Sequence, residues 1–166
     1  MSALLPSKRS NNRLWIALGR VLYLPAWPAL YIYLRYGGER TRIIVTSNDK
    51  ILLVRDWLGD GSWSLPGGGL HRGEVANIGA LRELKEETGL QVDPLQLILL
   101  DKMVLRGQGF RILVSCFCLN LSDDLFVQPS GREILDVGWF SVDKTLTKLN
   151  ISSSTRQLIE KWRKQL

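Results

Sequence analysis

Three glutamates near the middle of the chain, Glu83, Glu86 and Glu87, have the residue type and the spacing of a metal site. Apolar residues recur every three or four positions around them, which predicts a helix over 75–88. Positions i, i+3 and i+4 of a helix share one face, where like charges repel and the negative end of the helix dipole adds to the conflict. A hard divalent cation takes oxygen ligands and relieves both effects. A cation site is therefore one reading of these residues. Taken alone, three glutamates at this spacing are more often a solvated acidic face, and the residues around them decide between the two.

A glycine-rich loop and a further glutamate precede this helix. Residues 68–90 resemble the Nudix box, G-x5-E-x7-R-E-U-x-E-E-x-G-U with U a bulky apolar residue, at every specified position. The matching residues are Gly68, Glu74, Arg82, Glu83, Leu84, Glu86, Glu87, Gly89 and Leu90. So many fixed residues seldom coincide by chance, and residues 40–150 as a whole are also similar to this family.

The resemblance implies an α/β fold, a Nudix-like α/β/α sandwich with a mixed β-sheet. It implies hydrolysis that depends on Mg²⁺, or on Mn²⁺ in its place, and that cleaves the pyrophosphate of a nucleoside diphosphate linked to another moiety. Nucleoside triphosphates and nucleotide sugars such as ADP-ribose fit this description. The metal ligands implied are Glu83, Glu86, Glu87 and the carbonyl of Gly68. Arg82 would orient Glu83, and the motif's structural residues would be Glu74, which braces the loop, and Gly89.

Hydrolysis of a pyrophosphate needs a base for the attacking water, and a carboxylate suffices once a metal has lowered the pKa of that water. Glu83 and Glu133 are the two candidates, and together with Arg82 they form the expected catalytic set. A surface-loop acid is the alternative reading of Glu133. The residues expected to bind substrate are Arg55, Trp57 and Arg72.

The chain around the box predicts the elements that position it. Strands are expected over 42–46 and 50–55 around a turn at 47–49, with an extended piece at 63–65 leading into the glycines. Gly89 is a natural end for the helix over 75–88. Further strands are expected over 95–105, 110–121 and 137–140, and further helices over 142–149 and 154–165. Hairpins mixed with helices favour a mixed sheet over a purely parallel one.

The positive charge of the chain is concentrated at its N-terminal end. The 166 residues carry 22 Lys and Arg against 16 Asp and Glu, a net charge of +6. Residues 1–42 hold seven of the basic residues against Glu39 alone, so this quarter accounts for the whole excess. We divide the chain into a basic, apolar N-terminal extension of interfacial or packing helices (1–37) and a Nudix hydrolase domain (38–166). A folded body without net charge does not favour specific nucleic-acid binding.

Residues 14–36 are almost entirely apolar or aromatic, but Arg20, Pro25 and Pro28 interrupt them and argue against a simple membrane span. Apolar burial and basic charge together favour binding of residues 1–42 to an anionic membrane surface. Packing on the domain, or in a homodimer, is the alternative. No small-residue cleavage site follows, and two cysteines cannot form a disulfide framework. We therefore expect a cytoplasmic protein, peripheral on the inner face of the membrane.

Two other functions stay open at this point. One is a non-catalytic, nucleotide-sensing or nucleotide-binding module of the Nudix fold, which has no need of Glu83, Glu86 and Glu87 together. The other is a membrane-surface scaffold that acts through residues 1–36. A nucleotide-type small molecule is the expected substrate, and no second motif outside the box selects which one.

Overall fold

The computed structural model describes residues 38–57, 60–107, 110–130 and 133–165, so the predicted extension 1–37 lies outside the described residues. The strands are β1 (Arg40–Ser47), β2 (Lys50–Asp56), β3 (Trp63–Ser64), β4 (Ile98–Gly107), β5 (Phe110–Leu121) and β6 (Ile134–Ser141). The helices are α2 (Ala76–Thr88), the short 3-10 helix η1 (Pro94–Gln96), α3 (Val142–Lys148) and α4 (Ser153–Arg163).

The six strands form one mixed sheet. Its order is β3-β2-β1-β5-β4. β1 and β3 pair with the start and the end of β2 along one edge, and β6 pairs with the opposite edge of β2. β1 and β5 run parallel, and the remaining pairs are antiparallel. Asn48 and Asp49 join β1 to β2 with φ angles of 44° and 61°, the left-handed backbone that a two-residue hairpin turn requires. The predicted mixed sheet and its first hairpin are confirmed.

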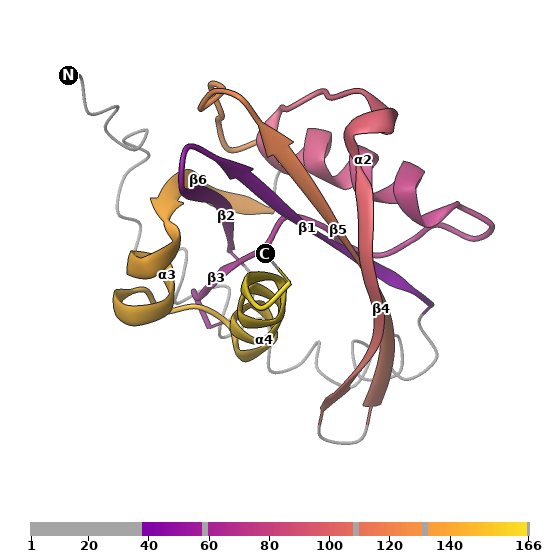
Figure 1. Cartoon of the computed structure of the whole chain (residues 1–166). Helices are drawn as coiled ribbons and strands as arrows, with labels where there is room; N and C mark the ends of the chain where they lie inside the picture. The colour runs from indigo at the N-terminus through magenta and orange to yellow at the C-terminus, as the bar shows by residue number, and fades with distance from the viewer. Residues whose placement is uncertain (1–37, 58–59, 108–109, 131–132, 166) are drawn as a thin grey trace.

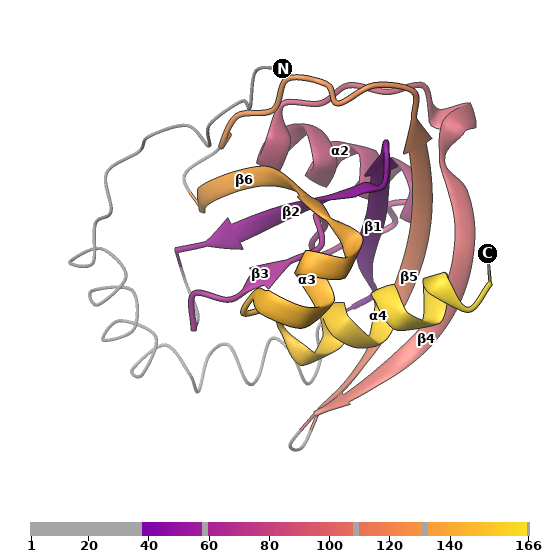
Figure 2. The same cartoon turned by 60° about the vertical axis from the view of Figure 1, so that its left-hand side comes forward.

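Alternation of side chains along the strands builds two apolar cores, one on each face of the sheet. Ile43 of β1 and Leu52 of β2 pack with Leu84 of α2 in one core. Their neighbours Ile44 and Ile51 point the other way, into a second core that α4 completes with apolar residues such as Leu158. Figures 1 and 2 show α2 on one side of the sheet and α3 and α4 on the other. The α/β/α sandwich expected from the sequence is therefore the observed architecture.

Residues 66–70, which follow β3 and are called the glycine loop below, lie along the first half of β1. Beyond the hairpin turn β1 and β2 diverge, and the loop takes the place of β2: Ile43 N–H donates to the Pro66 carbonyl (2.9 Å), and Thr41 N–H donates to the Gly68 carbonyl (2.8 Å). Gly67 has a φ of +129°, and a Cβ there would lie 2.4 Å from the Thr41 carbonyl oxygen. Only glycine allows this approach, which brings the loop under the end of α2.

Two predicted strand boundaries are wrong. The strand expected over 137–140 already begins at Ile134, because the pairing of β6 with β2 extends that far. The expected strand over 95–105 begins only at Ile98, because Pro94–Gln96 forms a 3-10 helix. Asp93 caps this helix by accepting from the Leu95 N–H (2.8 Å), and Gln96 returns a bond to the Asp93 N–H (3.3 Å). These local bonds outweigh the strand preference of the apolar residues nearby.

Across the described part of the chain, no helix is both long enough and apolar enough to cross a membrane.

Candidate active site

The last turn and a half of α2, residues 83–87, carries Glu83, Glu86 and Glu87 and is called the acidic turn below. Contacts before it and after it hold it in place. Leu84 and Ala80 are fully buried and tie the helix to the sheet. Gly89 then ends the helix in the left-handed conformation (φ 76°), with its N–H on the Lys85 carbonyl. Ser130 N–H donates to the Glu87 carbonyl at 3.1 Å, so the segment after β5 satisfies part of the helix end. The carboxylates of this turn are thereby fixed over the glycine loop.

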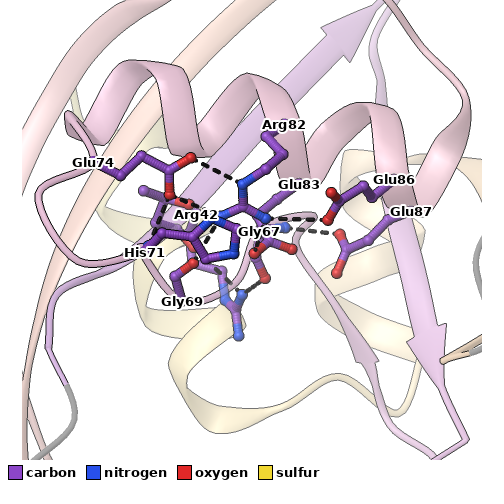
Figure 3. A network of polar contacts seen from close by, with 10 residues as sticks. Arg42, Gly67, Gly69, His71, Glu74, Arg82, Glu83, Glu86 and Glu87 are labelled. Atoms are coloured by element: carbon purple, nitrogen blue, oxygen red, sulfur yellow. Dashed lines mark hydrogen bonds and ion pairs between the residues drawn. The ribbon is translucent and has the colours of Figure 1, made fainter.

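Arg82 is the centre of the polar network (Figure 3). Its guanidinium donates to both oxygens of Glu74, each at 2.9 Å, and to the Gly69 carbonyl at 3.0 Å. The same group donates to Glu83 Oε1 at 2.9 Å and to Glu86 Oε2 at 3.1 Å. One cation therefore binds three carboxylates and the loop backbone, which offsets part of the repulsion that the sequence pattern implies.

Glu74 is the brace that the motif implies. Its bonds to Arg82, together with the His71 N–H that donates to Oε2 at 2.8 Å, lower its pKa to about 2. Gly79 lies opposite on α2, where a Cβ would meet Glu74 Oε2 at 2.9 Å and Leu70 Cδ2 at 2.2 Å. The loop can therefore pack directly onto the helix.

Glu87 stands in a different environment from its neighbours. Its Oε2 accepts the Gly67 N–H at 2.8 Å, and burial raises the pKa of Glu87 to about 8. The Gly67 bond and the charge of Arg42 oppose this rise, whereas the charges of Asp56 and Glu83 add to it. A half-buried carboxylate beside other carboxylates is a group that a bound cation would stabilise.

Gly68 makes room for the carboxylate of Glu83. A Cβ at Gly68 would lie 2.6 Å from Cδ and from both carboxylate oxygens of Glu83. Oxygen ligands pressed against the loop backbone fit a hard divalent cation in their chemistry. Within the described residues, however, no group of three or more His, Cys, Asp and Glu side chains is arranged to hold a metal ion. Glu83 and Glu86 both accept hydrogen bonds from Arg82. The ligand roles of Glu83, Glu86, Glu87 and Gly68 stay predictions.

The structure does not bring every predicted site residue to this cluster. Arg55 donates to Asp136 Oδ2 (3.1 Å) and lies over the Trp63 ring, 5.1 Å from its centroid, with the core on the α4 side. Arg72 is exposed on the box loop. Trp57 is half-buried, and its backbone N–H donates to the backbone carbonyl of the exposed Glu133 (2.9 Å). None of these contacts joins Arg55, Trp57 or Glu133 to the carboxylates of α2. Substrate binding by Arg55, Trp57 and Arg72 and base catalysis by Glu133 therefore stay predictions.

Three residues that sequence reasoning did not single out lie beside the carboxylates. Gly67 bonds Glu87, and Arg42 donates to the Gly67 carbonyl. Asp56, at the end of β2, has its pKa raised by burial and is close enough to Arg42, Glu133 and Glu87 to interact electrostatically. An acidic residue directly after the predicted strand 50–55 was a usable signal for Asp56. The roles of Arg42 and Gly67 depend on the pairing of the loop with β1, which no local pattern reveals.

Comparison with known proteins agrees with this geometry. The family model of the NUDIX domain matches residues 38–162. Over 106 residues the chain is 31% identical to the oxidized purine nucleoside triphosphate hydrolase of Danio rerio, covering 63% of this chain and 66% of the relative. It is 28% identical over 111 residues to phosphatase NudJ of Escherichia coli, with 66% and 72% covered. A MutT-like protein of Streptomyces ambofaciens is 29% identical over 107 residues.

Several curated relatives are longer than the match. The chain spans 28% of a Caenorhabditis elegans relative, and 65% and 66% of the Streptomyces and Danio proteins, each less than two thirds of that relative's length.

Solved structures share the fold. The NUDIX domain of Shewanella oneidensis NrtR, solved with ADP ribose, has a TM-score of 0.68 at 22% identity, covering 87% of this chain and 97% of that one. A bifunctional NMN adenylyltransferase/ADP ribose pyrophosphatase of Francisella tularensis, solved with AMP and a Mn ion, has a TM-score of 0.72 at 20% identity, with 89% and 48% covered.

Proposed function

Because the chain belongs to the NUDIX domain family, we propose that it is a hydrolase that cleaves, with Mg²⁺ or Mn²⁺, the pyrophosphate bond of a nucleoside diphosphate linked to another moiety. The observation that carries this proposal is the acidic turn of α2. Glu83 and Glu87 lie against the glycine loop, and Arg82 and the Gly67 N–H fix their carboxylates.

The residues present fit a divalent cation. Glu83, Glu86 and Glu87 would hold it, together with the Gly68 carbonyl, which already accepts the Thr41 N–H and has a second lone pair. When bound, such a cation neutralises the charge of the pyrophosphate and lowers the pKa of a coordinated water. Glu86 is the ligand most open to solvent, since its side chain is 56% exposed against 15% for Glu83.

The chain's own residues supply orientation and proton transfer. Arg82 holds Glu83 and Glu86 in one arrangement through a single guanidinium nitrogen, so that little reorganisation is needed during the reaction. Glu83 or Glu133 accepts the proton of the attacking water. Glu133 is tied through its carbonyl to the Trp57 N–H, and this bond holds the segment before β6 next to the end of β2.

The substrates named for similar proteins narrow the panel. The Danio relative is named for oxidized purine nucleoside triphosphates, and the Francisella neighbour for ADP ribose. For this chain we propose the same two classes, nucleoside triphosphates and nucleotide sugars. A purely nucleotide-binding module would bind these compounds without consuming them, and would not need Glu83, Glu86 and Glu87 together.

An assay for the release of nucleoside monophosphate from a panel of nucleotides tests the proposal. The full chain is incubated with nucleoside triphosphates, ADP-ribose and dinucleoside polyphosphates, with Mg²⁺, with Mn²⁺ or with a chelator. Cation-dependent formation of a nucleoside monophosphate from at least one compound is the expected result. Binding without turnover of every compound at every cation concentration would favour the binding module.

We also infer a location from the charge of the N-terminal region. Seven basic residues against one acidic residue in 1–42, beside the apolar stretch 14–36, favour attachment to the anionic inner face of a membrane in the cytoplasm. A homodimer that buries the same stretch is the competing proposal.

A further inference from the structure

Arg42 is a second basic residue, besides Arg82, in a site dominated by carboxylates. It lies on β1, half-buried, and its guanidinium donates to the Gly67 carbonyl. Figure 3 shows its side chain among the glycine loop and the glutamates of α2. The N–H of the same glycine donates to Glu87 Oε2 at 2.8 Å. One residue, Gly67, therefore connects the guanidinium of Arg42 to the carboxylate of Glu87.

The charges around Arg42 are unbalanced. Arg82 is occupied by Glu74, Glu83 and Glu86. Two half-buried carboxylates, Glu87 and Asp56, lie close enough to Arg42 to be stabilised by its positive charge, and Arg40 adds to this effect at Asp56. In the protein without a bound metal, Arg42 thus offsets the negative charge that Arg82 does not reach.

We propose that Arg42 is the resident counter-ion of this site: its guanidinium supplies positive charge that a divalent cation supplies on binding, so Arg42 competes with that cation and sets the affinity of the site for it. This inference rests on the proposed function, because it assumes that the acidic turn of α2 binds a divalent cation. It adds a residue outside the box that tunes the metal affinity.

The direction of the effect follows from charge. A unit positive charge repels a nearby dication, and the repulsion is strong where burial keeps the local dielectric low. Neutralising Arg42 is therefore expected to tighten cation binding and to destabilise the metal-free fold.

The test measures Mn²⁺ binding by electron paramagnetic resonance of free Mn²⁺, with the full chain and no substrate. Arg42→Met removes the charge and keeps much of the side-chain volume, and Arg42→Gln is a second neutral variant. We expect the Mn²⁺ dissociation constant to fall about tenfold in both, which is ~1.4 kcal/mol. Arg42→Lys keeps the charge and should stay within about threefold of wild type.

Arg156 provides a matched control. It too is a half-buried arginine that donates to a backbone carbonyl, that of Leu146 at 2.6 Å, but from α4, on the other face of the sheet. Arg156→Met should leave Mn²⁺ binding unchanged. If the neutral Arg42 variants do not fold alone, Mn²⁺ should restore their fold, and its failure to do so would overturn the inference.

The outcomes separate two failures. Wild-type protein that binds no Mn²⁺ would contradict the proposed function itself. Wild-type protein that binds Mn²⁺, with Arg42→Met binding it equally or more weakly, would contradict only the role of Arg42.

Discussion

Among single residues, Glu83, Glu86 and Glu87 have the same chemistry but not the same surroundings. Arg82 holds Glu83 and Glu86, whereas Glu87 is half-buried, accepts one backbone N–H and lies near the charge of Arg42. Position i, i+3 and i+4 on a helix predicts that the three share a face, but not that one of them is desolvated. Burial raises the pKa of Glu87, so its charge depends on pH above the range of an ordinary carboxyl.

The first prediction concerns Glu87 and pH. Because its pKa of about 8 in the folded chain exceeds the ordinary 4.5, the folded state binds more protons than the unfolded state between these values, and stability falls as pH rises through this window. Glu87→Gln removes the loss. In chelator, we expect equal unfolding free energies at pH 4.5 and a gain for the variant on the order of 2–4 kcal/mol at pH 9.

Chemical denaturation at several pH values measures this difference, and Glu86→Gln, which changes an exposed carboxylate of the same turn, is the control. A Glu87→Gln variant with the same slope of stability against pH as wild type would show that Glu87 is not desolvated.

The second prediction separates the two candidate bases. If Glu133 activates water, Glu133→Gln lowers turnover while Mn²⁺ affinity stays nearly unchanged. If Glu83 is the base and also a ligand, Glu83→Gln damages both, and Glu133→Gln is mild. Turnover and Mn²⁺ titration of the two variants decide between these outcomes, and two variants that both retain full turnover would exclude both residues.

At the scale of elements, the glycine loop is positioned by β1 as much as by α2. The sequence predicted the helix over 75–88, and α2 spans Ala76–Thr88, because its apolar spacing and Gly89 are local signals. The pairing of residues 66–70 with β1 is a contact between distant segments, and it alone brings Arg42 and Gly67 to the carboxylates. The predicted start of β4 was wrong for a local reason. The capping residues Asp93 and Gln96 stabilise a 3-10 helix there, although the apolar composition favours a strand.

The third prediction tests the contact between the loop and α2. Gly68→Ala places a Cβ 2.6 Å from the carboxylate of Glu83, which Arg82 holds in place, so the loop or the glutamate must move. We expect turnover to fall at least about tenfold, since a misplacement of about 1 Å can cost a hundredfold. Gly38→Ala, where a Cβ meets nothing within 4 Å, should behave as wild type. Full turnover in Gly68→Ala would mean that Glu83 need not lie where the structure places it.

For the whole molecule, two cores on opposite faces of one sheet hold the described residues together. Short continuous apolar runs in 42–46 and 50–55 predicted strands, and the burial of these runs on both faces follows from helices on each side of the sheet. The sequence could not give the strand order, because the parallel pairing of β1 with β5 joins segments about 70 residues apart. Residues 1–37 lie outside the described residues, so their proposed role rests on their composition alone.

The fourth prediction concerns this region. The full chain should bind anionic vesicles more tightly than neutral ones, since each basic residue near an anionic surface contributes about 1 kcal/mol. Salt should weaken this preference without abolishing binding, because screening leaves the apolar contribution intact. A protein beginning at Gly38 should stay folded and active and lose the vesicle binding. Aggregation of that shorter protein, together with indifference of the full chain to vesicles, would instead identify residues 1–37 as a packing element.

The most direct test of the central claim is the turnover of Glu87→Gln on a substrate that wild-type protein hydrolyses, at saturating Mg²⁺. The change keeps the size and the helix preference of the side chain and removes one charge from the proposed metal site. If the acidic turn of α2 is the catalytic centre, turnover falls at least about a hundredfold while the fold is retained. Turnover within a factor of about three of wild type would contradict the assignment.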